Sequence, residues 1–136
     1  MKSRLAVTAI LVAGIGLLLG AATASAHHSL SAEFDISKTT TITGTVTKME
    51  WTNPHAWLHV DVKDERGQVV PWNIEFGSPN ALYRRGWRRT DLPANVMVTV
   101  TGYLAKDGSK TISASDVKLP DGRTLFAGTR PAGAAR

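Results

Sequence analysis

The sequence predicts an all-β protein: a small five-stranded Greek-key barrel of the OB type, with one short helix between the third and fourth strands. Three observations predict it. Five segments rich in β-branched residues alternate apolar and polar positions, with turn residues between them. The first segment is long and contains Gly44, which indicates a bend or bulge. A helix-start pattern follows the third segment, and this order argues against the alternative, a small β-sandwich.

The first three strands are expected over residues 39–51, 57–63 and 69–76. Asn53-Pro54 and residues 64–67 supply the two turns between them. Because side chains alternate between the faces of a strand, each strand has an inward and an outward set. The inward residues are Ile42, Gly44, Val46, Leu58, Val60, Val62, Trp72, Ile74 and Phe76. The outward residues of the second and third strands are Trp57, His59, Asp61, Asn73 and Glu75.

The helix is expected to begin after Ser78, a good N-cap, with Pro79 at its first position and Gly86 just past its end. Two further strands are expected over residues 96–103 and 111–119, followed by a short edge strand at 124–126. Four apolar residues outside the regular pattern are also expected to pack against the core: Phe34, Ile36, Met49 and Met97.

Residues 1–26 have the pattern of a secretory signal peptide, with a basic start, an apolar run and an Ala24-Ser25-Ala26 cleavage site. Cleavage after Ala26 predicts a periplasmic or secreted protein with a barrel domain at 27–127 and a disordered tail at 128–136. No second long apolar run follows, so we expect no transmembrane segment after cleavage. The chain has no cysteine, and removal of Lys2 and Arg4 with residues 1–26 lowers its net charge from +5 to a mild +3. Together with the signal peptide, this argues against nucleic acid as a partner.

The four histidines are confined to two places, and this predicts a metal site. His27 and His28 begin the processed chain, while His55 and His59 lie near the start of the second strand. An N-terminal His offers its α-amine and its ring Nδ1 to one metal, and an α-amine loses its proton more readily than a lysine. A third nitrogen from His55, with His28 or His59 supporting, would complete a set that suits Cu(II). Zinc is the second choice of metal, and Trp57 is expected at the rim of the site.

A metal-free interpretation stands beside this one. His55 then only hydrogen-bonds within a turn, and His59 is a half-exposed strand residue. The sequence contains no nucleophile motif, phosphate-binding glycine loop or zinc-protease motif. We therefore predict no catalytic residues and expect binding rather than catalysis, with a copper-dependent oxidative enzyme as the third interpretation.

The segment after the helix is strongly basic and predicts an anion-binding surface. Arg84, Arg85, Arg88 and Arg89 surround Trp87 within six residues. Arginine makes bidentate contacts with phosphate and carboxylate groups. The partner would be an anionic glycan of the cell envelope or an envelope protein, bound by a module without metal. Alternatively, these arginines are solvated and favour the negative end of the helix dipole.

Three motifs resemble those of a family of small secreted bacterial proteins known only as a domain of unknown function. They are His27-His28-Ser29, the Trp51-Thr52-Asn53-Pro54-His55 segment, and residues 78–87, which read SPNALYRRGW. The resemblance covers nearly all of the chain after residue 26. It implies secretion and a β-barrel-like domain, and it brings no assigned activity.

Overall fold

A computed structural model of the protein describes residues 30–128. The chain divides into two compact units, residues 1–33 and residues 34–136. The barrel belongs to the second unit. No helix within the described residues is long and apolar enough to cross a membrane.

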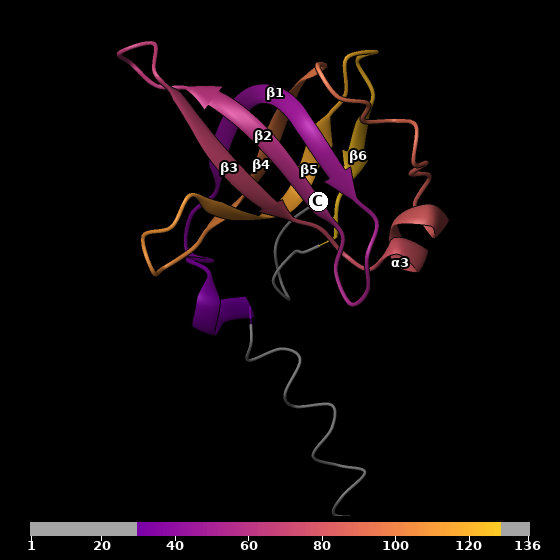
Figure 1. The fold of residues 1–136 in the computed structure, drawn as a ribbon. Helices are drawn as coiled ribbons and strands as arrows, with labels where there is room; N and C mark the ends of the chain where they lie inside the picture. The colour runs from indigo at the N-terminus through magenta and orange to yellow at the C-terminus, as the bar shows by residue number, and fades with distance from the viewer. Residues whose placement is uncertain (1–29, 129–136) are drawn as a thin grey trace, which may run out of the picture. The chain divides into compact units, whose positions relative to one another are not determined.

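The barrel is closed by five strands, and a sixth strand is added at one edge (Figure 1). β1 pairs with β2 on one side and with β4 on the other, while β3 closes the ring by a parallel pairing with β5. The first half of β5 contacts β3, and its second half contacts β6. The elements are β1 (Thr40–Glu50), β2 (Trp57–Lys63), β3 (Val69–Glu75), α3 (Pro79–Arg84), β4 (Met97–Leu104), β5 (Thr111–Lys118) and β6 (Thr124–Phe126). The predicted fold class is confirmed, including the helix between the third and fourth strands.

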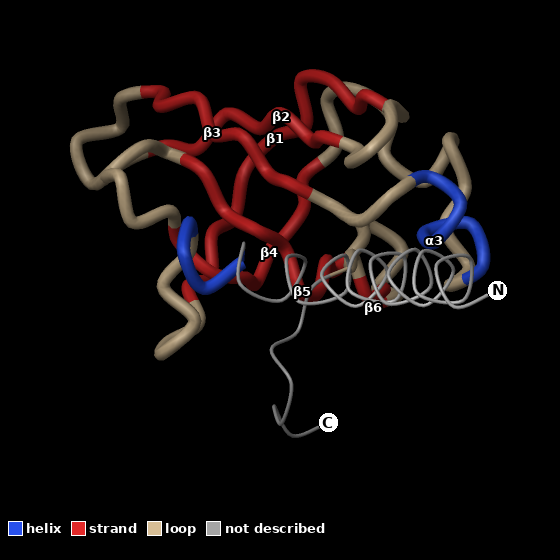
Figure 2. Tube along the Cα trace, turned by 90° about the horizontal axis from the view of Figure 1, so that it is seen from below, coloured by secondary structure: helices blue, strands red, loops and turns tan. Residues whose placement is uncertain are grey.

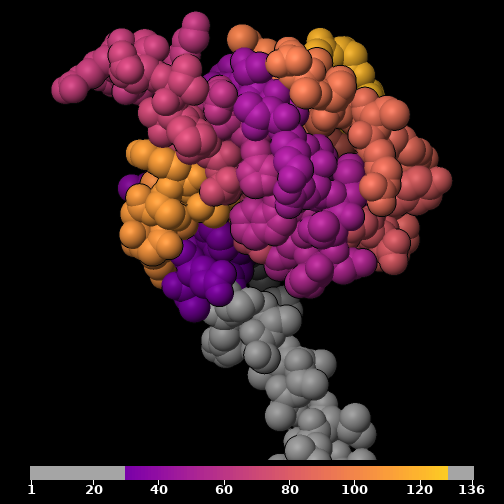
Figure 3. Space-filling view, viewed as in Figure 1, coloured from indigo at the N-terminus to yellow at the C-terminus, as the bar shows by residue number. Residues whose placement is uncertain are grey.

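The alternation of apolar residues fills the barrel as the sequence predicts. Leu58, Val60 and Ile74 are fully or almost fully buried, and Val98 and Val100 of β4 face them across the interior. Viewed from below, the strands enclose this core and α3 lies to one side of them (Figure 2). The hairpin that joins β2 to β3 projects from the body of the barrel (Figure 3). This projecting part carries Val69, which is 57% exposed.

Two apolar residues that we expected against the core are exposed. Ile36 is 37% exposed and Met97 is 64% exposed. Met97 is the neighbour of the inward-facing Val98, so the alternation of the strand turns its side chain outward. The other two expectations are confirmed: Phe34 is buried and forms a β-bridge with Ala105, and Met49 packs against the core.

The helix begins and ends where its sequence signals predict. Ser78 Oγ accepts a hydrogen bond from the Ala81 N–H, and Pro79 occupies the first turn. Gly86 follows with a φ of 98°, and the Trp87 N–H then bonds back to the Leu82 carbonyl oxygen. This reversal drives Trp87 into the core, where it is fully buried.

We expect Gly102→Ala to destabilise the barrel at the pairing of β4 with β5. A Cβ at Gly102 would contact the Ser113 carbonyl oxygen and lie 2.6 Å from Ile112 Cγ2. Because one of these neighbours is backbone, the strands must separate, at a cost near the upper end of about 1–3 kcal/mol. Urea unfolding measures the loss.

Gly77→Ala is the matched control for this substitution. The nearest atom to a Cβ at Gly77 is 3.4 Å away, an ordinary contact. Its stability should stay within about 0.5 kcal/mol of the original protein, the usual range for uncomplicated substitutions. Equal losses of stability in the two variants would mean that the close approach of the strands at Gly102 is not the cause of the loss.

Candidate functional site

The outer face of β1, β2 and β3 gathers both described histidines and two glutamates. The register pairs Trp57 with Glu75 of β3 and with Glu50 of β1. His59 pairs with Asn73 on one side and with Lys48 on the other. A β-bulge between Val46 and Lys48 shifts the end of β1 by one position and so sets this second register. The result is a polar strip across three strands.

His55 lies at the end of this strip, just before β2. The pairing continues past the strand, because the Ala56 N–H donates to Gly77 and Ala56 accepts from the Phe76 N–H. His55 therefore lies next to Glu75, and its Nδ1 hydrogen-bonds to Glu75 Oε1. In this contact Nδ1 is the ring nitrogen that faces the carboxylate, and Nε2 is the ring nitrogen that stays available to a metal. No described residue contacts that Nε2, and the His55 side chain is 49% exposed.

His59 lies further along the same face with different partners. Its Nδ1 is 2.8 Å from Asn73 Oδ1, and its Nε2 is 3.8 Å from Glu50 Oε1. Lys48 hydrogen-bonds to Glu50, and this contact, with the charge of the ammonium group, holds the pKa of Glu50 below its ordinary value. The neighbouring His59 lowers the pKa of Glu50 further. Glu50 is thus an ionised carboxylate at neutral pH, and both nitrogens of His59 face polar partners.

The two histidines do not converge on one point. They lie four positions apart on extended chain, which corresponds to a distance of about 13 Å along the strand. Among residues 30–128, no group of three or more His, Asp and Glu side chains is arranged to hold a metal ion. The other predicted ligands, His27 and His28, lie outside the described residues. Trp57, which was predicted at the rim of the site, is half-buried and lies between His55 and His59 in the sequence.

The arginines of the basic segment divide among separate aromatic partners. Arg85 lies over the Phe126 ring at 4.6 Å, and Arg88 lies over Tyr83 at 4.2 Å. Arg89 lies 5.7 Å from the Trp51 ring centre. Arg84 is exposed in the last turn of α3. Three of the four guanidinium groups therefore each have an aromatic partner of their own.

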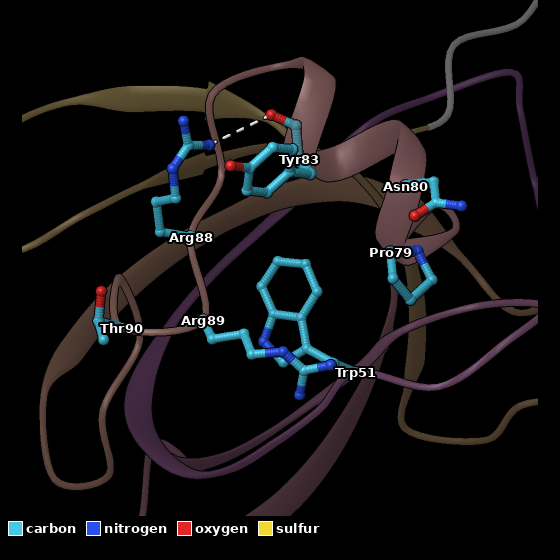
Figure 4. Close-up of a pocket in the computed structure, with 7 residues that line it drawn as sticks. All are labelled: Trp51, Pro79, Asn80, Tyr83, Arg88, Arg89 and Thr90. Carbon is cyan, nitrogen blue, oxygen red and sulfur yellow. Dashed lines mark hydrogen bonds between the residues drawn. The ribbon is translucent and has the colours of Figure 1, made fainter.

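A pocket of about 440 Å³ opens between the end of β1, α3 and the loop that follows α3 (Figure 4). It lies apart from the histidines. The residues that line it are Trp51, Pro79, Asn80, Tyr83, Arg88, Arg89 and Thr90. Sequence reasoning named the two arginines but not Trp51 or Tyr83 as their neighbours, because the pocket joins segments that are far apart in the chain.

The fold and these surfaces define a small all-β barrel protein of the OB type. The chain belongs to a family of unknown function, DUF6152, whose family model matches residues 15–114. The expected membership of an uncharacterised family is confirmed. No curated protein matches the chain.

Proposed function

We propose that the protein binds one copper ion outside the cytoplasm, after residues 1–26 are removed. His27 is the main ligand through its α-amine and ring Nδ1, and His55 Nε2 is the third nitrogen. His28 and His59 have supporting roles. Three nitrogens in a tetragonal set suit Cu(II), which also stands at the top of the affinity order for divalent metals. Zinc is the competing metal.

The observation that carries this proposal is the contact between His55 and Glu75. A ligating histidine commonly donates its second ring N–H to a carboxylate, which fixes the ring and makes the ligating nitrogen more basic. His55 has this arrangement: Nδ1 is held by Glu75 and Nε2 has no partner among residues 30–128. Nε2 of His59 instead faces Glu50, so His55 is the better ligand of the two.

The same features favour binding over catalysis. His55 is an exposed residue on the outer face of the barrel, and the pocket beside α3 has no histidine in its lining. Copper carriage or copper resistance fits such a surface site. A copper-dependent oxidative enzyme ranks third, because it would also need a surface beside the metal that binds a substrate.

The experiment is a Cu(II) titration of the chain that begins at His27. Loss of a direct ligand should cost at least as much as loss of an outer partner, which typically costs about 10- to 100-fold. We therefore expect His55→Ala to weaken binding by about 100-fold and Glu75→Gln by about tenfold.

His59→Ala is the comparison variant, because it removes an imidazole from the same face that has only a supporting role. It should weaken copper binding by no more than about threefold, a difference well below 1.4 kcal/mol. The assignment of His55 fails if the two histidine variants bind copper equally.

The second candidate function is a metal-free module that binds an anionic glycan or protein of the cell envelope through Arg84, Arg85, Arg88 and Arg89. A specific observation favours it: Arg88 and Arg89 border a pocket whose lining contains no acidic residue. The two functions use different parts of the barrel, and arginine and histidine substitutions therefore separate them.

A further inference from the structure

The pocket beside α3 has the size and the walls of a small-molecule site. Its volume of about 440 Å³ lies within the range of about 300–1,000 Å³ that is usual for ligand pockets. Trp51 reaches it from the end of β1, and Pro79 and Tyr83 reach it from α3. Figure 4 shows the indole of Trp51 pointing toward Tyr83, with Pro79 alongside. Two aromatic rings and a proline ring give the pocket flat apolar walls.

The two arginines of the pocket differ in how they are held. The Arg88 guanidinium lies over Tyr83 and donates hydrogen bonds to the carbonyl oxygens of Tyr83 and Trp87, at 3.2 and 2.8 Å. Arg89 makes no ion pair or hydrogen bond within the described part of the chain, and its guanidinium lies beside the Trp51 ring. One cation of the pocket is therefore fixed, and the other is open to a ligand.

The nearest carboxylate in the sequence does not neutralise Arg89. Asp91 Oδ1 pairs with the Arg123 guanidinium at 2.8 Å, and Asp91 Oδ2 accepts from the Arg88 backbone N–H at 2.7 Å. Both of its oxygens thus have partners other than the Arg89 guanidinium. The positive charge at the pocket remains uncompensated by any residue that lines it.

The indole N–H of Trp51 is a second donor without an acceptor. Its Nε1 is covered from solvent and has no hydrogen-bond partner within residues 30–128. A covered donor of this kind carries a desolvation penalty that an incoming acceptor would remove. The Arg89 guanidinium lies next to it (Figure 4). Two adjacent donors, one of them charged, match the oxygens of a carboxylate.

We infer that the pocket binds a small carboxylate that carries one ring with an apolar face. The carboxylate lies between Arg89 and the Trp51 N–H, and the ring lies against Trp51 and Tyr83. This inference rests on the second candidate function and narrows it, from a polyanion held over the whole basic segment to a small ligand held in one pocket. An aromatic acid and a uronic acid share this chemistry.

The test uses the ¹H–¹⁵N spectrum of the chain that begins at His27, where each of the four tryptophans gives one indole signal. Trp51→Phe identifies the Trp51 signal by its loss and keeps a ring in the pocket. The ligands are 4-hydroxybenzoate and glucuronate, with uncharged phenol and glucose as their matched controls. We expect at least one of the two carboxylates to move the Trp51 signal at millimolar concentration, and its uncharged control to bind about tenfold more weakly. The carboxylate that binds more tightly identifies the source.

Arginine variants decide whether the pocket is the site. Arg89→Gln should weaken carboxylate binding by about tenfold or more, and Arg66→Gln, in the hairpin between β2 and β3 and outside the pocket lining, should leave it unchanged. The inference is overturned if neither carboxylate moves the Trp51 signal. It is also overturned if a sulfated polysaccharide binds and Arg89→Gln and Arg84→Gln weaken its binding equally, because the basic segment then acts as one surface. In that last case the second candidate function stands and only the pocket fails.

Discussion

Acetylation of the His27 α-amine is expected to weaken Cu(II) binding by about a hundredfold or more, the upper end of what loss of an outer metal partner costs. Acetylation turns the α-amine into an amide nitrogen, which holds its proton far more strongly. The chelate ring that the α-amine and Nδ1 of His27 close on the metal is then lost, although every imidazole remains. Isothermal titration of the two chains with Cu(II) measures the difference.

The control is the same titration at lower pH. Protons compete with a metal for amine and imidazole nitrogens, so the affinity of the chain that begins at His27 should fall steadily as the solution is acidified. The acetylated chain should show a weaker dependence, because one of the proton-binding ligands is missing. Equal affinities for the two chains would exclude the amine as a ligand.

Replacement of Trp87 by alanine should lower the free energy of unfolding by about 3–5 kcal/mol. Trp87 is fully buried, its ring meets Phe76 edge to face at 5.3 Å, and its Nε1 donates to the Phe126 carbonyl oxygen at 2.9 Å. Alanine leaves a cavity and removes the hydrogen bond to the Phe126 carbonyl oxygen. Folded domains are typically stable by only about 5–15 kcal/mol, so a loss of this size can unfold the chain entirely. Urea unfolding, or the absence of a folded baseline, measures it.

Two further variants separate the causes. Trp87→Phe keeps most of the buried ring and removes the hydrogen bond to Phe126, so its loss should be smaller. Trp57→Ala removes a ring that is only partly buried on the outer face, and we expect a loss of about 1 kcal/mol. If Trp57→Ala cost as much as Trp87→Ala, the packing of Trp87 against Phe76 would not be a main support of the barrel.

The strands could be predicted because their signal is local. Alternation alone placed Leu58, Val60 and Ile74 inside and His59, Asn73 and Glu75 outside. The same alternation places Met97 outside. The prediction that Met97 packs against the core was wrong, because it was based on the apolar character of the side chain alone. The burial of Trp87 has no such local signal. Its neighbours are arginines, and its burial follows from the chain reversal at Gly86, which returns it to the core.

The contacts of the candidate sites depend on register, which periodicity does not fix. His55 meets Glu75 because the hairpin between β2 and β3 sets Trp57 opposite Glu75. His59 meets Glu50 because a β-bulge shifts the end of β1. The pocket beside α3 joins Trp51 to Arg89, which lie on either side of two strands and a helix in the sequence. The residue types at these sites could be read from the sequence, but their partners required the folded chain.

The measurement that tests the account most directly is electron paramagnetic resonance of the chain that begins at His27, loaded with one equivalent of Cu(II). Histidine labelled with ¹⁵N distinguishes imidazole nitrogens from others through their hyperfine couplings. A shared site at His27 and His55 predicts a tetragonal spectrum with couplings from two imidazoles, and loss of one of them in His55→Ala. A spectrum that is unchanged in His55→Ala, or copper that remains in its aqueous form, would contradict the proposed site.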